Sequence, residues 1–104
     1  PLLAREYHYL NADELMELKR EGVYGDMLLR FFDENGRECD TSMKDRTLSI
    51  GFEEYKKIPT KIVVAADAKK AYTIRAILRG GLADVIIIDH LLARELLRIT
   101  NTAD

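Results

Sequence analysis

The first part of the chain places its apolar residues at helical spacing. Leu15 and Leu18 lie three residues apart and so share one helix face. Asn11 and Glu14 precede them in the arrangement of a capping box, in which each side chain bonds the other residue's backbone amide. The pattern therefore predicts a helix that begins after Asn11 and ends at Gly22, since glycine commonly closes helices.

A mainly apolar stretch and a turn sequence come next. Residues 25–32 predict a strand. Residues 33–36 contain an Asn-Gly step, which favours a tight turn, so we expect a hairpin that returns through residues 37–40. Further on, residues 47–52 predict another short strand, and residues 53–57 predict a single helical turn before a proline.

The second half of the chain alternates strand and helix patterns. Residues 61–66 and 84–88 are short runs rich in β-branched residues, typical of buried parallel strands. Between them, residues 68–79 carry an apolar helical stripe, and a last helix is expected to reach Leu97, with a frayed tail from Thr100. The order strand, helix, strand, helix predicts a βαβα unit with a parallel sheet, hence an α/β fold.

Length and charge limit what this chain does. Its 104 residues correspond to one small domain. Sixteen basic and eighteen acidic residues give a net charge of −2 and a pI near 5.7. A nucleic-acid surface needs clustered Lys and Arg. Any contact with DNA is therefore expected from residues outside this chain.

Several chemistries find no support in the sequence. Cys39 is the only cysteine, so no internal disulfide is possible and a reducing, cytoplasmic setting is expected. The longest apolar run, residues 85–88, is far shorter than the roughly 20 residues of a membrane helix. His8 and His90 lie far apart without metal-ligand spacing. We see no Gly-rich phosphate loop or catalytic triad, and we expect no cofactor and no metal.

The ends of the two predicted parallel strands carry the candidate chemistry. In open α/β sheets, ligands bind beyond the carboxyl ends of the strands. Asp67 and Lys70 follow the first strand, and Asp89 follows the second. Carboxylates accept hydrogen bonds from sugar hydroxyls, while a helix N-terminus and a lysine suit a phosphate. This combination indicates a site for a polyol or a sugar phosphate.

The same residues also have a purely structural interpretation. Asp67 and Asp89 each precede a predicted helix, where an aspartate that caps the first turn contributes about 1 kcal/mol. Lys70 fits equally a solvated position on a helix surface. Both interpretations remain open at the level of spacing.

Five stretches in chain order resemble motifs of the SorC-type sugar-binding transcriptional regulators. Residues 22–36 resemble the family's G-x-x-G-D-x-x-x-R-F-F-D-x-x-G stretch, and residues 70–82 its K-A-x-A-I-x-A-A-L-R-G-G-L stretch. Shorter similarities lie at residues 45–51, 58–65 and 89–97. No single stretch is diagnostic, but their ordered sum is specific.

The resemblance implies a fold and a setting. It implies a Rossmann-like three-layer α/β fold, with a parallel βαβα C-terminal half and a β-hairpin, similar to ribose-phosphate isomerase and CoA transferases. Residues 1–104 would be the C-terminal portion of a sugar effector-binding domain. A helix-turn-helix domain outside this chain would bind operator DNA, and the intact regulator would be a homo-oligomer, commonly a tetramer.

The resemblance also assigns site residues. Asp26 matches an acidic residue that contacts sugar hydroxyls, and Lys70 matches a lysine that approaches the ligand's phosphate. Asp89 lies near the ligand mouth. Arg46 matches by sequence, without an assigned role. Where the family has Gly-Gly, this chain has an alanine followed by Asp67, which puts a negative charge where a phosphate would sit and suggests an unphosphorylated sugar or polyol, or a weakened site.

Three functions are compatible with these features. The first is sensing of a sugar, polyol or sugar phosphate without turnover, in a regulator of carbohydrate metabolism. The second is a sugar-phosphate isomerase or deaminase-like enzyme of the same fold, with Asp26 or Asp89 as the base. The third is a truncated protein that acts only in oligomerisation. We favour sensing, because no second acid-base partner stands out beside either carboxylate.

Overall fold

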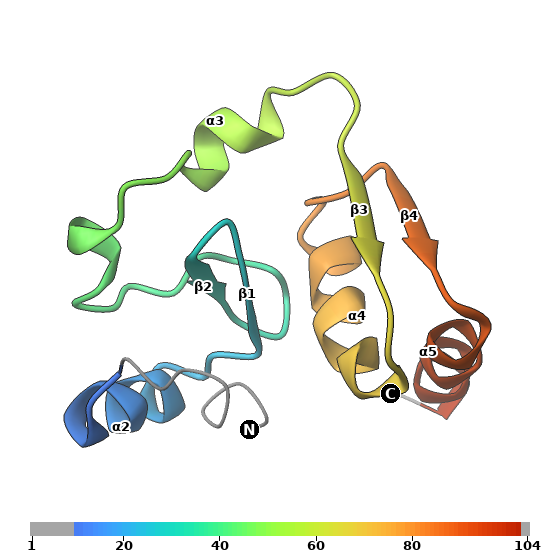
Figure 1. The fold of residues 1–104 in the computed structure, drawn as a ribbon, viewed down its shortest axis with the longest axis horizontal. Helices are drawn as coiled ribbons and strands as arrows, with labels where there is room; N and C mark the ends of the chain where they lie inside the picture. The colour runs from blue at the N-terminus through green and yellow to red at the C-terminus, as the bar shows by residue number, and fades with distance from the viewer. Residues whose placement is uncertain (1–9, 103–104) are drawn as a thin grey trace.

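The computed structural model describes residues 10–102, so the predictions that concern His8 lie outside the described residues. An antiparallel strand pair and a parallel strand pair are both present (Figure 1), which confirms a mixed α/β fold. The elements are α2 (Ala12–Arg20), β1 (Gly25–Met27), β2 (Arg30–Phe32), η1 (Lys44–Arg46), α3 (Phe52–Lys56), β3 (Ile62–Ala65), η2 (Ala68–Lys70), α4 (Ala71–Arg79), β4 (Val85–Ile88) and α5 (His90–Thr102).

The first helix, α2, has the predicted capping box. The backbone N–H of Glu14 donates to Asn11 Oδ1 at 2.8 Å, and the backbone N–H of Asn11 donates to Glu14 Oε1 at 3.0 Å. These bonds satisfy amides that have no partner within the helix. Gly22 follows the helix with a φ of +71°, a conformation that glycine adopts without steric cost.

The single strand predicted over residues 25–32 is wrong. The chain reverses in its middle, at Leu28 and Leu29, and Met27 pairs with Arg30 across the turn. Both leucines have positive φ, 57° and 64°, as a two-residue type I′ turn requires. Leucine is disfavoured in that region because its Cβ crowds the backbone. Sequence reasoning therefore has no reason to place a turn here.

The predicted Asn-Gly turn is confirmed as a second reversal. Gly36 has a φ of +75°, and the Asp33 carboxylate accepts hydrogen bonds from the backbone N–H groups of Asn35 and Arg37. The returning segment makes one isolated bridge, Phe32 to Glu38. It does not form a strand.

The strand predicted over residues 47–52 is also wrong. This segment is a loop whose carbonyl groups bond a side chain. The Arg30 guanidinium donates from Nε to the Ile50 carbonyl and from Nη2 to the Ser49 carbonyl, both at 3.0 Å, and pairs with Glu38 at 3.0 Å. The helical turn predicted next is present as α3.

The predicted parallel unit is confirmed. β3 pairs with β4 in parallel, from Ile62 opposite Val85 to Ala65 opposite Ile88, and α4 is the crossover between them. Where the strands begin, Asp84 Oδ2 accepts from the Lys61 backbone N–H at 2.8 Å and pairs with Lys61 Nζ at 3.0 Å. These bonds lower the pKa of Asp84, the backbone bond most.

One face of the parallel sheet is covered and the other is exposed. The side chains packed against the core are those of Val63, Ala65, Ile86 and Ile88. Those on the other face are 45–71% exposed and belong to Ile62, Val64, Val85 and Ile87. Sequence reasoning expected strands buried on both faces. Among residues 10–102, helices cover only one face, so the third layer of the expected arrangement is not part of the described chain.

The last helix begins after Asp89 and extends further than predicted. The backbone N–H of Leu92 donates to Asp89 Oδ1 at 2.9 Å, which confirms the predicted N-cap. The helix continues to Thr102, beyond the expected end at Leu97 and past the expected start of fraying at Thr100. Within residues 10–102, no helix combines the length and the apolar character needed to cross a bilayer.

Strand β2 joins two separate groups of buried side chains. Phe31 packs with Leu18 of α2, whereas the next residue, Phe32, is fully buried with Ile74 of α4 and Leu92 of α5. Successive residues of a strand point to opposite faces. The hairpin is therefore a layer between α2 and the parallel unit.

Two glycines, Gly25 in β1 and Gly36 in the turn after β2, allow the hairpin and its following turn to contact α4 directly. A Cβ atom on Gly36 would lie 2.3 Å from the carbonyl oxygen of Ala76 and 2.7 Å from Gly80 Cα. A Cβ atom on Gly25 would lie 2.7 Å from Thr73 Cγ2. The backbones of Gly36 and Gly80 are in direct contact, and the Gly25 backbone contacts the Thr73 side chain, so no larger residue fits without moving the hairpin away from α4.

Alanine substitutions at four glycines test this contact. Gly36→Ala combines the clash with a positive φ and is expected to destabilise most, by about 3 kcal/mol or more. Gly80→Ala meets the clash alone and is expected to cost about 1–3 kcal/mol. Gly22→Ala carries only the positive φ, and Gly51→Ala carries neither penalty. Urea unfolding measures the free energy of unfolding of each variant. A loss of stability for Gly51→Ala equal to that for Gly36→Ala would contradict the expected order.

The exposed sheet face is expected to make the 104-residue chain self-associate when it is produced by itself, because contiguous apolar surface favours burial against another surface. Replacing Val64 and Ile87 together with threonine should shift sedimentation velocity profiles toward monomer. Leu48→Thr, at a 99% exposed position away from the sheet, is the matched control and should leave the profile unchanged. A monomeric unsubstituted chain would contradict this expectation.

Candidate functional site

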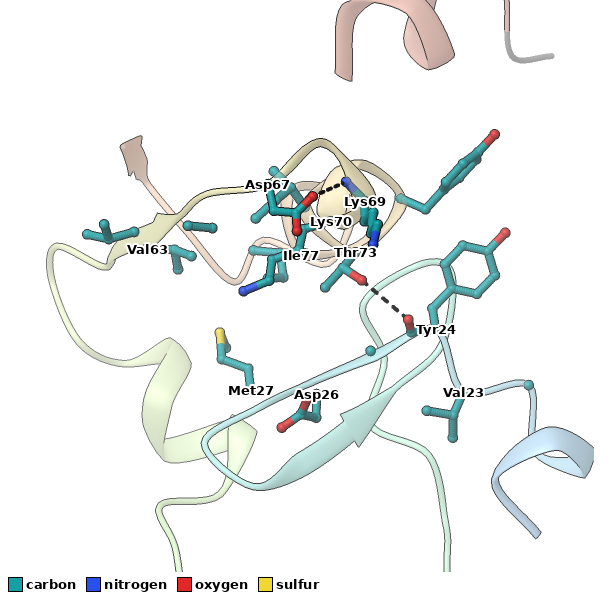
Figure 2. A pocket seen from close by; sticks show the side chains of 16 residues that line it. Val23, Tyr24, Asp26, Met27, Val63, Asp67, Lys69, Lys70, Thr73 and Ile77 are labelled. Atoms are coloured by element: carbon teal, nitrogen blue, oxygen red, sulfur yellow. Dashed lines mark hydrogen bonds between the residues drawn. The ribbon is translucent and has the colours of Figure 1, made fainter. Parts of the chain in front are cut away.

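A cavity of about 860 Å³ lies between the hairpin and the parallel unit (Figure 2). One wall is residues 22–27, the loop after α2 and strand β1. The other is built from residues 63–65 of β3, residue 67 of the following loop, and residues 69, 70, 72–74 and 77 of η2 and α4. The cavity thus lies at the carboxyl end of β3, where an open parallel sheet is expected to bind ligands.

Asp26 reaches the cavity from the hairpin wall. It is the middle residue of β1, opposite Phe31 of β2, and it is half-buried. Its neighbour Met27 also lines the cavity and packs against the core of the parallel unit. The tight turn after Met27 keeps this wall short.

Asp67 and Lys70 line the opposite wall. The Asp67 carboxylate accepts a hydrogen bond from the backbone N–H of Lys69 at 3.0 Å, and the Asp67 carbonyl accepts from that of Lys70 at 3.0 Å. The predicted N-cap is therefore present. The capping and the cavity-lining interpretations of Asp67 are compatible, because the same side chain does both.

Asp89 supports this wall from outside the cavity. It is not among the lining residues. Its Oδ1 caps α5, and its Oδ2 accepts from the backbone N–H of Asp67 at 3.4 Å. The structure thus brings the ends of β3 and β4 together as predicted, but Asp89 acts on the loop. Its direct contact with a ligand stays a prediction.

Arg46 lies in η1, and its side chain is outside the part of the chain that the structure describes. Of the other four predicted site residues, Asp26, Asp67 and Lys70 line one cavity, and Asp89 does not. The ligand role of each of the five stays a prediction.

Sequence reasoning missed four polar lining residues, namely Tyr24, Lys69, Tyr72 and Thr73. The rings of Tyr24 and Tyr72 form an edge-to-face pair with centroids 6.4 Å apart. The Thr73 hydroxyl donates to the Tyr24 carbonyl at 3.4 Å, joining the two walls (Figure 2). The spacing 69, 70, 73, 77 marks one helix face and could have identified Thr73. No local signal indicates that Tyr24 lies opposite.

The charged side chains of the lining are balanced. Asp26 and Asp67 carry formal negative charges, and Lys69 and Lys70 carry positive ones. Among the described residues, no group of three His, Cys, Asp or Glu side chains could hold a metal ion. The arrangement presents hydrogen-bond acceptors, ammonium donors and aromatic faces around a largely apolar space, as expected for a small polar molecule.

The lone thiol, Cys39, belongs to the other core and not to the cavity. Burial, with smaller contributions from Asp33, Glu21 and Glu38, raises its pKa to about 11. The thiol is therefore protonated near neutral pH, and this side chain acts as a small apolar group.

The fold and the cavity define a small ligand-binding α/β domain. Residues 3–98 match the sequence family described as "Putative sugar-binding domain". The deoxyribonucleoside regulator of Bacillus subtilis is 36% identical over 85% of this chain and 28% of its own length. The sorbitol operon regulator of Klebsiella pneumoniae is 28% identical over 91% of this chain and 30% of its own length.

Solved structures agree. A DeoR family transcriptional regulator from Listeria monocytogenes is 34% identical, with a TM-score of 0.81 over 88% of this chain and 37% of that one. The full-length sorbitol operon regulator SorC from Klebsiella pneumoniae is 30% identical, with a TM-score of 0.78 over 83% of this chain and 28% of that one. The chain thus spans about a third of these proteins. It belongs to the sugar-binding domain family of SorC-type transcriptional regulators, which confirms the resemblance read from its motifs.

The double role of Asp89 leads to a stability prediction. Asp89→Ala removes the α5 cap and the acceptor of the Asp67 amide, and it is expected to cost about 1–2 kcal/mol. Asp40→Ala, at an exposed position away from the cavity, is the control and should be nearly neutral. Urea unfolding of the two variants provides the comparison, and equal stabilities would argue against this role.

Proposed function

We propose that this chain is the C-terminal portion of an effector-binding domain and that it senses a sugar-type molecule in the cavity, without turnover. The observation that carries the proposal is that Asp26 on one wall, and Asp67 and Lys70 on the other, line one space of about 860 Å³. Family membership supports it, since the relatives are transcriptional regulators. This shared lining also speaks against a relic that acts only in oligomerisation.

The position of the cavity suggests how binding could be transmitted. Its walls belong to the hairpin and the parallel unit, so a ligand that contacts both favours the arrangement in which they are docked. A ligand shifts an equilibrium only by its difference in affinity for the two states. The intact protein is proposed to be a cytoplasmic homo-oligomer, commonly a tetramer in this family, with operator DNA bound by a helix-turn-helix domain encoded outside this chain.

Sensing accounts for the geometry better than catalysis does. An isomerase or deaminase requires a base that is free to take a proton from the substrate. Asp89, one of the two candidate bases, already accepts backbone amides with both of its oxygens. Asp26 is the other candidate base. The other two residues of its strand, Gly25 and Met27, have no acid-base group.

Calorimetric titration of the full-length protein tests the proposal. The panel comprises sorbitol, deoxyribose and their monophosphates, chosen from the names of the relatives. At least one compound is expected to bind. Asp26→Asn and Lys70→Met should each weaken binding by about tenfold, the loss of one charge-assisted hydrogen bond.

Lys57→Met is the matched control, because Lys57 is exposed and pairs only with Glu54 in the same helical region. It should leave affinity unchanged. Chemical conversion of any compound, or binding that both cavity variants leave intact, would contradict the proposal.

A further inference from the structure

In the loop after β3, Asp67 has a backbone conformation that favours glycine. Asp67 has φ +93° and ψ 120°, in the left-handed half of backbone space, where a Cβ atom is disfavoured. The adjacent bonds show what the aspartate supplies that glycine cannot. Its carboxylate lines the cavity and bonds the backbone N–H of Lys69.

Carboxylate and carbonyl oxygens of the protein already engage the amides of this loop. The N–H of Lys69 donates to Asp67 Oδ1, and the N–H of Asp67 donates to Asp89 Oδ2. The N–H of Lys70 donates to the Asp67 carbonyl. A phosphate group that approached the loop would find these three donors occupied and two carboxylates beside them.

The rest of the lining does not compensate for this. Asp26 lines the opposite wall with its carboxylate turned away from the loop (Figure 2), and the formal charges of Asp26 and Asp67 cancel those of Lys69 and Lys70. A phosphate monoester brings between one and two negative charges near pH 7, which a balanced lining leaves unneutralised. An uncharged hydroxyl can donate to the Asp67 carboxylate.

We propose that Asp67 sets the ligand class of this cavity, selecting an uncharged sugar or polyol over its phosphorylated counterpart. The inference rests on the proposed function, because it names the ligand of the same cavity. Asp67 does this in two ways. Its carboxylate accepts a hydrogen bond from a ligand hydroxyl. Its negative charge repels a phosphate from the same space, and its bond to the Lys69 backbone N–H occupies a donor that a phosphate would use.

Two substitutions separate charge from hydrogen bonding. Asp67→Asn keeps an oxygen for the Lys69 amide, tolerates positive φ, and removes only the charge. Asp67→Gly removes both charge and acceptor and suits the φ of the position. Asp40→Asn, at an exposed site away from the cavity, is the charge-matched control. Thermal melts of all variants establish that each is folded.

The measurement is the ratio of dissociation constants, monophosphate over unphosphorylated compound, for sorbitol and for deoxyribose with the full-length protein. The unchanged protein and Asp40→Asn should bind the unphosphorylated compound at least about tenfold more tightly. Asp67→Asn should reduce that ratio, and Asp67→Gly should reduce it further, by about tenfold or more.

The outcomes distinguish this inference from the function on which it rests. Equal or tighter binding of the monophosphates by the unchanged protein overturns the inference and leaves sensing in place. A ratio that favours the unphosphorylated compound but does not respond to Asp67→Gly overturns the role of Asp67. Failure of all four compounds to bind overturns both.

Discussion

The backbone of Gly36 lies against the last turn of α4, at a separation that admits no side chain on either Gly36 or Gly80. This contact joins the hairpin to the parallel unit, and Phe32 of the hairpin is buried with Ile74 and Leu92 of that unit. The cavity is the space left between these two parts where they diverge. The cavity therefore depends on the backbone contact between Gly36 and Gly80, which holds the hairpin against α4.

The chemistry of the cavity follows from how its second wall ends. β3 ends at Ala65, and Asp67 is the N-cap residue of η2. Its carboxylate accepts a hydrogen bond from the backbone N–H of Lys69. Asp89 holds this turn from the end of β4. Aspartates at the ends of two neighbouring parallel strands thus cooperate, one facing the cavity and one fixing the loop. The Asp67 side chain both caps η2 and lines the cavity.

The parallel sheet that contributes to the cavity also has an exposed apolar face. Its alternating apolar residues have the composition of strands covered on both sides, yet within residues 10–102 only one side is covered. The matched segment is about a third of its regulator relatives. The cavity wall and the exposed sheet face share strand β3.

Local patterns in the sequence determined the capping box at Asn11, the Asn-Gly turn at Gly36 and the parallel βαβα unit, because each depends on residues close in the chain. The ordered motifs also indicated the family, and Asp26, Asp67 and Lys70 as candidates. Only the tertiary structure decided the turn at Leu28 and Leu29, the loop held by Arg30, and the meeting of Tyr24 with Tyr72. The Arg30 bonds join residues 19 and 20 apart in the chain and the two tyrosines are further apart still, so neither feature leaves a periodic signal. The turn is local, but it uses two leucines at positive φ, which local preference disfavours.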